Sequence, residues 1–251
     1  MSIFYRAFLL FISVWNIGPD EAESIGRNIY KSECSGQKEK LTWWNEGEQF
    51  ASLGIGHFIW YAEGKVGPFE ETFPALLVFL KQQGAAVPVW LKSARYCPWG
   101  SKREFSEKMQ KEKGELQTLL FQTVALQAAF IIQRFEQKTE KLFQDLPKEH
   151  QDKSLKKMAS IACTTHGKYA LVDYLHFKGD GSSPQERYQG YGWGLKQVIE
   201  EMPDDAQEPL TAFSKSAKII LTRRVQNAPP ERHEERWLSG WLARVDSYLK
   251  S

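Results

Sequence analysis

The first strong pattern of apolar and polar positions along the chain has the period of an α-helix. It begins at Pro19, carries acidic residues in its first turn, and places Ile25, Ile29 and Glu33 at successive intervals of four residues. Proline and acidic side chains are typical of helix N-termini, and residues four apart lie on the same face of a helix. We therefore predict a helix over 19–34 in which Glu33 shares a face with two isoleucines.

A segment with the composition of β-strands follows this helix. Residues 37–62 are rich in Gly, Thr, Trp, Phe and Ile, and the sequence NEGE at 45–48 separates two apolar runs. Such a segment predicts a hairpin or a small three-stranded sheet, here called the β lobe. Within it, Gly54 and Gly56 favour a close approach of two backbones or a bulge.

Helical patterns account for most of the remaining chain. Residues 69–84 predict an amphipathic helix interrupted at Pro74, and residues 113–146 form the longest apolar periodic stretch, expected to be the core helix of the larger lobe. Later segments predict, in order, a helix over 154–177 interrupted near Gly167, a Gly/Ser-rich loop over 178–194, a helix from Leu195 and two helices around the sequence NAPPER at 227–232.

Together these elements predict an α+β, mostly α-helical protein, in which residues 19–251 form a single two-lobed domain with the β lobe after the first helix. A chain of 251 residues and 28.9 kDa can bury a core without disulfides or metals. Its 33 Lys and Arg residues are interspersed with 31 Asp and Glu residues, which argues against nucleic acid as a partner. The aromatic content of 13% suits a cleft lined with flat side chains, although an aromatic core explains each ring equally well.

The cysteines and histidines predict neither a disulfide framework nor a metal site. Three widely separated cysteines allow at most one disulfide, and no histidine pair has a zinc-binding spacing such as HExxH. We therefore expect no metal and no cofactor. The residues concerned are Cys34, Cys97, Cys163, His57, His150, His166, His176 and His233.

The N-terminal residues bear on the location of the protein. An apolar run from Ala7 to Trp15 follows Arg6; it is too short for a membrane-spanning helix but has the length of the hydrophobic part of a secretory signal. We accordingly interpret residues 1–18 as a signal peptide and expect a periplasmic or secreted protein without a stable membrane span. The alternative is an apolar N-terminal helix packed on the core of a cytoplasmic protein.

Glu33 is the first candidate for chemistry. A carboxylate on the apolar side of a helix is costly to leave ionised, so burial there should raise its pKa and keep it protonated near neutral pH. A carboxyl group in that state can act as a general acid. The alternative interpretation is a solvated glutamate at a frayed helix end.

Three stretches of the chain resemble the phage-type lysozymes, or endolysins. The sequence IYKSECSG at 29–36 is similar to the end of their first helix, which carries a catalytic glutamate, and ASLGIGH at 51–57 is similar to the strand and Gly-x-Gly-His turn of their small sheet. The sequence LTRRVQNAPPERHEERWLSGW at 221–241 is similar to the Arg-Arg, Glu-Arg and Trp-Leu-x-Gly pattern that closes many endolysins. The chain is also similar to bacterial proteins of unassigned function that share the runs LTxWNxGExFxSLGIGHFIWY and GWGLxQV, which suggests a distinct relative of the lysozymes.

This resemblance implies a monomeric lysozyme-like glycosidase that cleaves a β-1,4-linked amino-sugar polymer, peptidoglycan or a chitin-like chain. Glu33 takes the role of the general acid, and Ser52 stands where those lysozymes use a threonine hydroxyl to hold the attacking water. The resemblance leaves the second carboxylate open among Glu46, Glu48 and the polar Asn45, because the segment between Glu33 and Ser52 is longer than usual in that family. Strand alternation favours Glu48, since it has the parity of Phe50 and Ser52 if the strand begins that early.

Further residues are expected to contact the substrate. In the β lobe these are Trp44, Asn45 and His57. His57 could hydrogen-bond the acid or orient the sheet, although a buried, satisfied histidine is the more common arrangement. The sequence GLKQ at 194–197 is similar to the Gly-Leu-Met-Gln signature of lytic transglycosylases. We expect Gln197 beside the substrate and Tyr191 and Trp193 to stack on sugar rings or, equally, to pack their loop on the core. Three other acids would replace Glu33 if it proved structural: Asp173, Asp180 and Glu186.

Two alternative functions stay open. A lytic transglycosylase needs a single acid/base glutamate, so it would make a missing second carboxylate harmless. A non-catalytic module of lysozyme fold would bind a glycan or a protein in the same cleft without cleaving it.

Overall fold

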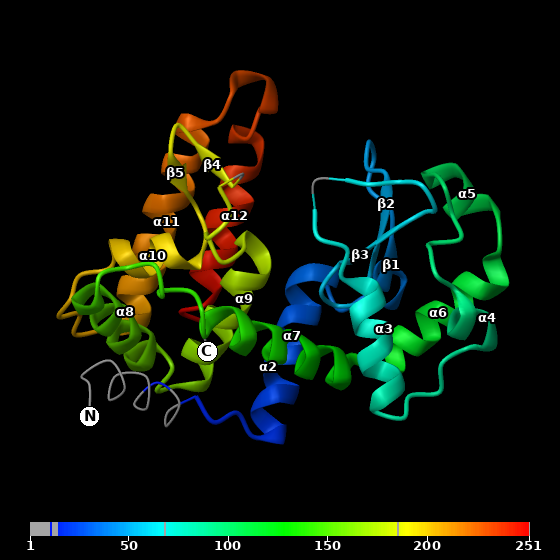
Figure 1. Cartoon of the computed structure of the whole chain (residues 1–251), viewed down its shortest axis with the longest axis horizontal. Coiled ribbons are helices and arrows are strands. Elements are labelled where there is room, and N and C mark those ends of the chain that lie inside the picture. Colours follow the sequence, from blue (N-terminus) through cyan, green and yellow to red (C-terminus); the bar gives the residue numbers. More distant parts are fainter. Residues whose placement is uncertain (1–10, 12–14, 68, 185, 251) are drawn as a thin grey trace. The chain divides into compact units, whose positions relative to one another are not determined.

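The computed structural model describes residues 11, 15–67, 69–184 and 186–250 (Figure 1). It is an α+β protein of mainly α-helices with a small antiparallel sheet, as predicted. The chain divides into two compact units. We call Ala22–Ile132 the sheet unit, and the described residues up to Glu21 together with those from Gln133 onward the helical unit.

The sheet unit contains a three-stranded antiparallel sheet of order β1-β2-β3, so the β lobe predicted at 37–62 is confirmed. In the register of the sheet, Ser52 lies opposite Trp43 on one side and Ile59 on the other. Helix α3 lies against β3, as Figure 1 shows. The elements are α2 (Pro19–Cys34), the 3-10 turn η1 (Lys38–Leu41), β1 (Thr42–Trp43), β2 (Phe50–Leu53), β3 (Phe58–Tyr61), α3 (Phe73–Gln82), α4 (Val89–Ser93), α5 (Lys102–Glu107), α6 (Gln110–Gln122) and the first part of α7 (Val124–Thr139).

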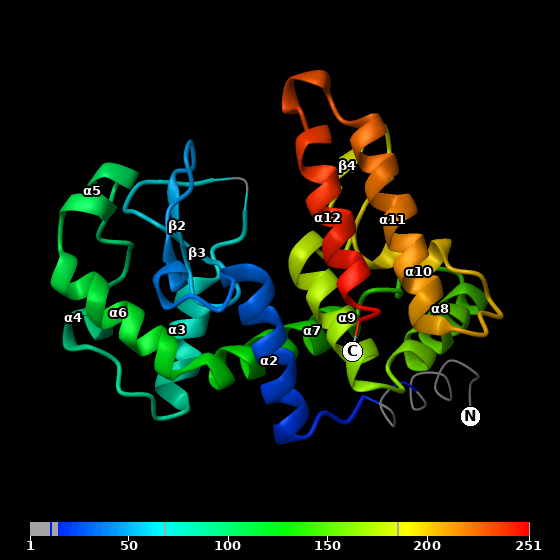
Figure 2. The ribbon, with the colours of Figure 1, turned by 180° about the vertical axis from the view of Figure 1, so that it is seen from behind.

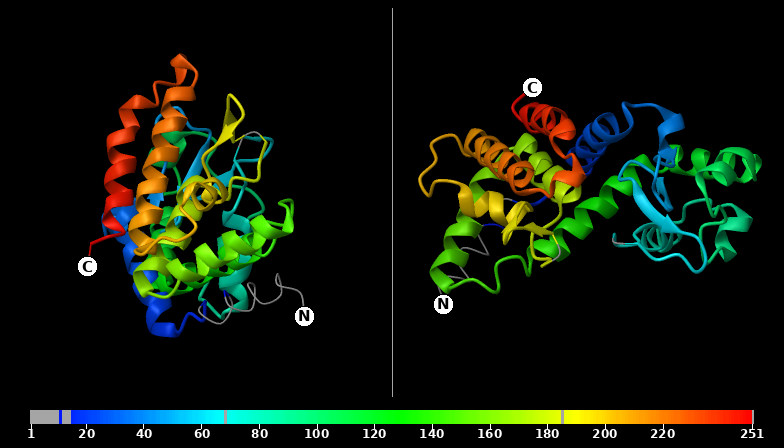
Figure 3. Two further views of the ribbon diagram at one scale, coloured as in Figure 1. Left: turned by 90° about the vertical axis from the view of Figure 1, so that its left-hand side faces the viewer. Right: turned by 90° about the horizontal axis from the view of Figure 1, so that it is seen from above.

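The helical unit is built on the long pair α11 and α12, which lie side by side in Figures 2 and 3. Asp173 is fully buried and receives two hydrogen bonds from the Arg244 guanidinium, at 2.9 and 2.7 Å, and one from the Tyr248 hydroxyl, at 2.6 Å. The elements are the rest of α7, α8 (Lys148–Ile161), α9 (Thr165–Lys178), β4 (Arg187–Tyr188), β5 (Tyr191–Gly192), α10 (Leu195–Glu201), α11 (Pro209–Asn227), the 3-10 turn η2 (Pro230–Arg232) and α12 (Glu235–Ser247). The predicted helix from Leu195 and the two helices around NAPPER are confirmed.

Two predicted helix boundaries were wrong. Pro74 does not interrupt α3 but lies in its first turn, where a missing backbone N–H costs no helical hydrogen bond. The apolar stretch at 113–146 is two helices, α6 and α7, with axes bent by 71°. The break falls at Thr123, whose hydroxyl donates to the Leu119 carbonyl at 2.8 Å.

The predicted helix at 154–177 is also interrupted, but at a different position from the predicted one. Helix α8 ends at Ile161 and α9 begins at Thr165, so Gly167 lies inside α9 rather than at the interruption. A Cβ atom on Gly167 would lie 1.8 Å from the Ile161 carbonyl oxygen, so the glycine allows the start of α9 to approach the end of α8. The predicted loop at 178–194 contains the short antiparallel hairpin β4–β5.

The predicted signal peptide falls mostly outside the described residues. Of that segment, the described Trp15 is buried in the helical unit, where its ring stacks on Phe135 at 4.4 Å and its indole N–H donates to Glu136 at 3.0 Å. Phe11 is buried beside it. These contacts are those of the alternative interpretation, an apolar segment packed on the core, and the location of the protein stays a prediction.

In the part of the chain that the structure describes, no single helix has the length and apolar composition needed to cross a membrane. Helices α6 and α7 reach that length only together, as the bent pair.

A buried amide fixes the turn between β2 and β3. The Gln127 side chain on α7 is fully buried, and its oxygen accepts the Ile55 N–H at 2.9 Å. Its nitrogen donates to the Leu120 carbonyl at 2.6 Å and to the Thr123 hydroxyl at 3.1 Å. Gly54 has φ +70°, and a Cβ atom there would lie 2.2 Å from the Gln127 oxygen, so only glycine allows this approach.

We predict that Gln127→Leu lowers the free energy of unfolding by about 1–3 kcal/mol, because the Ile55 N–H and the Leu120 carbonyl lose their buried partner. Urea unfolding followed by tryptophan fluorescence measures the change. The matched control is Gln122→Leu, the same substitution at an exposed position at the end of α6. Equal losses in the two variants would contradict a role for the buried amide.

Candidate active site

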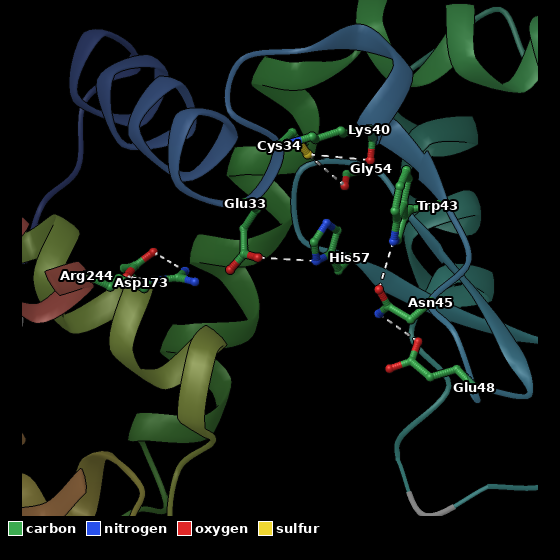
Figure 4. A network of polar contacts seen from close by, with 10 residues as sticks. All are labelled: Glu33, Cys34, Lys40, Trp43, Asn45, Glu48, Gly54, His57, Asp173 and Arg244. Atoms are coloured by element: carbon green, nitrogen blue, oxygen red, sulfur yellow. Dashed lines mark hydrogen bonds and ion pairs between the residues drawn. The ribbon is translucent and has the colours of Figure 1, made fainter. Parts of the chain in front are cut away.

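Glu33 lies in the last turn of α2, on the face that the spacing predicted. Ile25 and Ile29 on this face are fully buried, and the Glu33 side chain is 14% exposed. One Glu33 carboxylate oxygen lies 3.2 Å from Nδ1 of His57, and Figure 4 shows the two groups facing each other. The structure therefore brings together two residues that the sequence placed on separate elements.

His57 reaches Glu33 because of the conformation of the turn from Gly54 to His57. The His57 N–H donates to the Gly54 carbonyl at 3.3 Å, and His57 itself has φ +46°, in the left-handed region that few residues with a side chain adopt. Such a backbone persists where surrounding contacts hold it, and here the Gln127 amide does so. The imidazole remains 35% exposed, so it is not the fully buried histidine of the alternative interpretation.

Cys34 links the end of α2 to the same turn. Its Sγ atom lies 3.8 Å from both the Lys40 and the Gly54 carbonyl oxygens, and the side chain is fully buried. Burial, together with the nearby Glu33 carboxylate, raises the pKa of the Cys34 thiol to about 12. The thiol therefore stays protonated, as a weak hydrogen-bond donor that holds the base of Glu33 beside the turn.

Glu48 is held by a short chain of hydrogen bonds at the edge of the sheet. The Trp43 indole N–H donates to the Asn45 side-chain oxygen at 2.8 Å, and the Asn45 amide donates to a Glu48 carboxylate oxygen at 3.0 Å (Figure 4). Burial raises the pKa of Glu48, and the hydrogen bond from Asn45 opposes this increase. Strand β2 begins only at Phe50, so strand alternation does not determine where Glu48 points.

Glu46, the other candidate for the second carboxylate, lies in solvent. Its side chain is 90% exposed and forms an ion pair with Lys102. The hydrogen bond from Lys102 lowers the pKa of Glu46. Of the two glutamates in this turn, only Glu48 is partly withdrawn from water.

Ser52 and the exposed Trp43 lie on one face of the sheet. They are direct cross-strand partners, and cross-strand partners share a face. Ser52 is 4% exposed in the central strand, while Trp43 at the edge is 46% exposed. Trp43 was not among the predicted site residues, and its sequence pattern does not distinguish it from the adjacent Trp44; the exposure of Trp43 follows from the register of β1 with β2.

The structure corrects the expectation that Trp44 contacts substrate. Its ring is 3% exposed and packs beside Phe105 at 5.8 Å. The indole N–H donates to the Glu48 backbone carbonyl at 2.9 Å. Trp44 is thus a core residue that supports the turn carrying Asn45 and Glu48.

The other predicted substrate contacts lie in the helical unit and differ from one another. Tyr191 is 55% exposed at the β4–β5 hairpin. Trp193 is 7% exposed, with the Arg224 guanidinium 4.0 Å from its ring centre, so it packs the loop as the second interpretation expected. The Gln197 amide accepts the Gly194 N–H at 3.0 Å and donates to the Gly181 carbonyl at 3.1 Å, which makes it a support of the loop.

The alternative acids also lie in the helical unit. Asp173 belongs to the buried ion pair with Arg244 and is structural. Burial would raise the pKa of Asp180, but hydrogen bonds from Ser182 lower it on balance. Burial and the charge of Asp180 raise the pKa of Glu186, which keeps that residue a candidate acid.

Comparisons with known proteins assign no function to the chain, so the function has to be inferred from the candidate site. No protein-family model, curated protein or solved structure matches the chain significantly. Within the described residues, no group of three or more His, Cys, Asp or Glu side chains is placed to hold a metal ion.

We predict that Glu48→Gln stabilises the protein at neutral pH. Because the pKa of Glu48 is higher in the folded than in the unfolded chain, the folded state binds more protons between the two values, and stability falls as the pH rises through that window. Glutamine removes this cost, so the melting temperature of the variant should exceed that of the parent near pH 7. The two should coincide below about pH 3, where the carboxyl is protonated in both states.

The matched control is Glu46→Gln in the same turn, for which we expect the melting temperature to change in the opposite direction. The pKa of Glu46 is lowered, so its ionised form stabilises the fold above its usual pKa, and the substitution should slightly decrease the melting temperature at neutral pH. A decrease in both variants would contradict the unfavourable burial of Glu48.

Proposed function

We propose that the protein is a glycoside hydrolase of lysozyme type, which cleaves the β-1,4-linked amino-sugar polymer peptidoglycan. The observation that carries the proposal is the contact between Glu33, on the apolar face of α2, and His57 of the Gly-x-Gly-His turn. The same unit contains a second partly buried carboxylate, Glu48, with its own hydrogen-bond donor. Two carboxyl groups in different environments are the requirement of glycoside hydrolysis.

In this proposal Glu33 is the general acid. Its side chain is largely removed from water, and the 3.2 Å contact allows one proton to be held between its carboxyl group and the His57 imidazole. The carboxyl protonates the glycosidic oxygen as the bond to the leaving sugar breaks. His57 then orients the carboxyl and stabilises its ionised form, a positioning role that takes the place of the expected direct contact with substrate.

Glu48 is the second carboxylate of the proposal. In its ionised form it stabilises the positive charge that develops on the sugar ring, or activates the attacking water, and Asn45 holds one of its oxygens in place. Ser52 lies on the same face of the sheet as Trp43, and its hydroxyl group is the one that holds the attacking water in this proposal. The exposed indole of Trp43 offers a flat surface for a sugar ring.

One observation favours a lytic transglycosylase as the second candidate. Burial raises the pKa of Glu48 and so disfavours the ionised form, which is the form that would serve as a base or stabilise positive charge. Glu33 would then act alone, as acid and afterwards as base, and the product would be an anhydro sugar. Either reaction on cell walls requires export, so we propose a periplasmic or secreted location.

We predict that Glu33→Gln lowers the rate of cell-wall clearing by about 10²–10⁴-fold, the usual contribution of a general acid. Loss of turbidity of purified cell walls measures the rate, and circular dichroism checks the fold. Glu39→Gln, at an exposed position of η1, is the matched control and should retain the rate of the parent. Parental activity in the Glu33 variant would remove Glu33 from the mechanism. Binding to walls without release of fragments by the parent would indicate a non-catalytic module.

The role of Glu48 separates the two reactions. If the enzyme hydrolyses, Glu48→Gln should remove most of the activity, and the parent should release sugars with a free reducing end. A transglycosylase should tolerate the substitution and release products lighter by one water. Mass spectrometry of the released fragments measures both, and hydrolytic products from a fully active Glu48→Gln variant would contradict the role given to this residue.

A further inference from the structure

A groove in the helical unit lies outside the candidate active site. It has a volume of about 460 Å³, within the range of small-ligand pockets, and is open to solvent between the β4–β5 hairpin, α10 and α11. Six of its ten lining residues have charged or polar side chains, and the exposed ring of Tyr191 adds apolar surface. An aromatic face beside charged and polar side chains suits a ligand that has both hydroxyl groups and an apolar face.

The walls of the groove are held in place by hydrogen bonds between one side chain and the backbone. Gln197 joins the Gly181 carbonyl to the Gly194 N–H. A Cβ atom on Gly192 would lie 2.9 Å from the Gln197 amide, so the glycine lets the hairpin approach this side chain. The hairpin is therefore fixed before a ligand binds, which lowers the entropic cost of binding.

Arg187 brings a positive charge to the groove, where its hydrogen bonds go to neutral carbonyl groups and its charge also interacts with Glu200. Its guanidinium donates to the Gly190 carbonyl at 3.2 Å and to the Gly181 carbonyl at 3.4 Å. Carbonyl oxygens orient a guanidinium without neutralising it. By contrast, Arg223, which lies 5.8 Å from the Tyr191 ring centre, donates to the Glu201 carboxylate at 3.0 Å.

Glu200 and Glu201 supply hydrogen-bond acceptors beside these donors. Burial raises the pKa of Glu200, while the positive charges of Lys196 and Arg187 oppose the increase. A groove lined by both acceptors and donors can bind the hydroxyl groups of a sugar, since each hydroxyl both donates and accepts.

We propose that this groove binds a saccharide that carries a carboxylate. One sugar ring stacks on Tyr191, its hydroxyl groups bond to Glu200 and Glu201, and its carboxylate pairs with Arg187. The lining residues of the groove support a carboxylate-bearing saccharide as the ligand. Only the identity of the polymer depends on the proposed function. In peptidoglycan the matching group is the lactyl carboxylate of N-acetylmuramic acid residues that carry no stem peptide, because the peptide is otherwise joined to this carboxyl group by an amide bond.

The test is calorimetric titration of the full-length Glu33→Gln protein with two disaccharides. One contains N-acetylglucosamine and N-acetylmuramic acid, and the other is neutral di-N-acetylchitobiose. We expect about tenfold tighter binding of the acidic disaccharide, the usual gain from a charge-assisted pair. Adding Tyr191→Ala should weaken the binding of both roughly three- to tenfold through loss of the stacked ring. Adding Arg187→Gln should remove the preference.

Control variants at other positions test whether the changes in binding are specific to the groove. Tyr96→Ala and Arg103→Gln make the same changes at exposed positions of the sheet unit and should bind as the Glu33→Gln protein does. Arg187→Lys keeps the charge, so it should keep the preference even though the bonds to the loop carbonyls change. Failure to bind either disaccharide at millimolar concentration, or equal effects of Tyr191→Ala and Tyr96→Ala, would overturn the proposal. A preference retained in Arg187→Gln would overturn it as well.

Failure here is distinguishable from failure of the proposed function. The effects of Tyr191→Ala and Arg187→Gln report binding at the groove of the helical unit and need no catalysis, whereas cell-wall clearing tests Glu33 in the sheet unit. A parent protein that clears no walls but binds through Tyr191 would refute the glycosidase and support the groove. Wall clearing that depends on Glu33, with no effect of Tyr191→Ala or Arg187→Gln on binding, would do the reverse.

Discussion

The buried amide of Gln127 is the constraint on which the candidate active site depends. It accepts the Ile55 N–H and donates to two oxygens of the α6–α7 connection, so the β2–β3 turn is attached to the core rather than to a neighbouring strand alone. Because the turn is fixed, His57 can keep a left-handed backbone and place its imidazole beside Glu33. The Cys34 thiol brings the other partner to the same turn, since it lies against the Gly54 carbonyl.

Buried carboxylates that are fully paired with hydrogen-bond donors and carboxylates that are not lie in different parts of the molecule. Asp173 and Glu234 are almost completely buried, and each accepts two hydrogen bonds from a guanidinium and one from a tyrosine hydroxyl. Such groups stabilise the packing of α12 and have no capacity left for chemistry. Glu48 accepts an amide hydrogen bond and has a raised pKa, which is the state expected of a group that exchanges protons or responds to charge.

Much of the local structure could be predicted from the sequence, but the composition of the site could not. The helix at 19–34 and the strands at 37–62 were predictable because caps, turn residues and hydrophobic period are properties of neighbouring residues. Two adjacent tryptophans, Trp43 and Trp44, have the same local pattern, yet one is exposed and the other is in the core. That difference depends on Phe105 and on the register of β1 with β2, which lie elsewhere in the chain.

The sequence by itself determined the α+β class and the helical face that carries Glu33. Tertiary structure alone decided that Glu33 meets His57, that Glu48 rather than Glu46 is withdrawn from water, and that Tyr191 borders a groove while Trp193 supports it. The physical reason is that pairing and burial depend on residues distant in the chain, as in the bond between Ile55 and Gln127 across 72 positions. Local periodicity gives the face of an element, and packing decides which group that face meets.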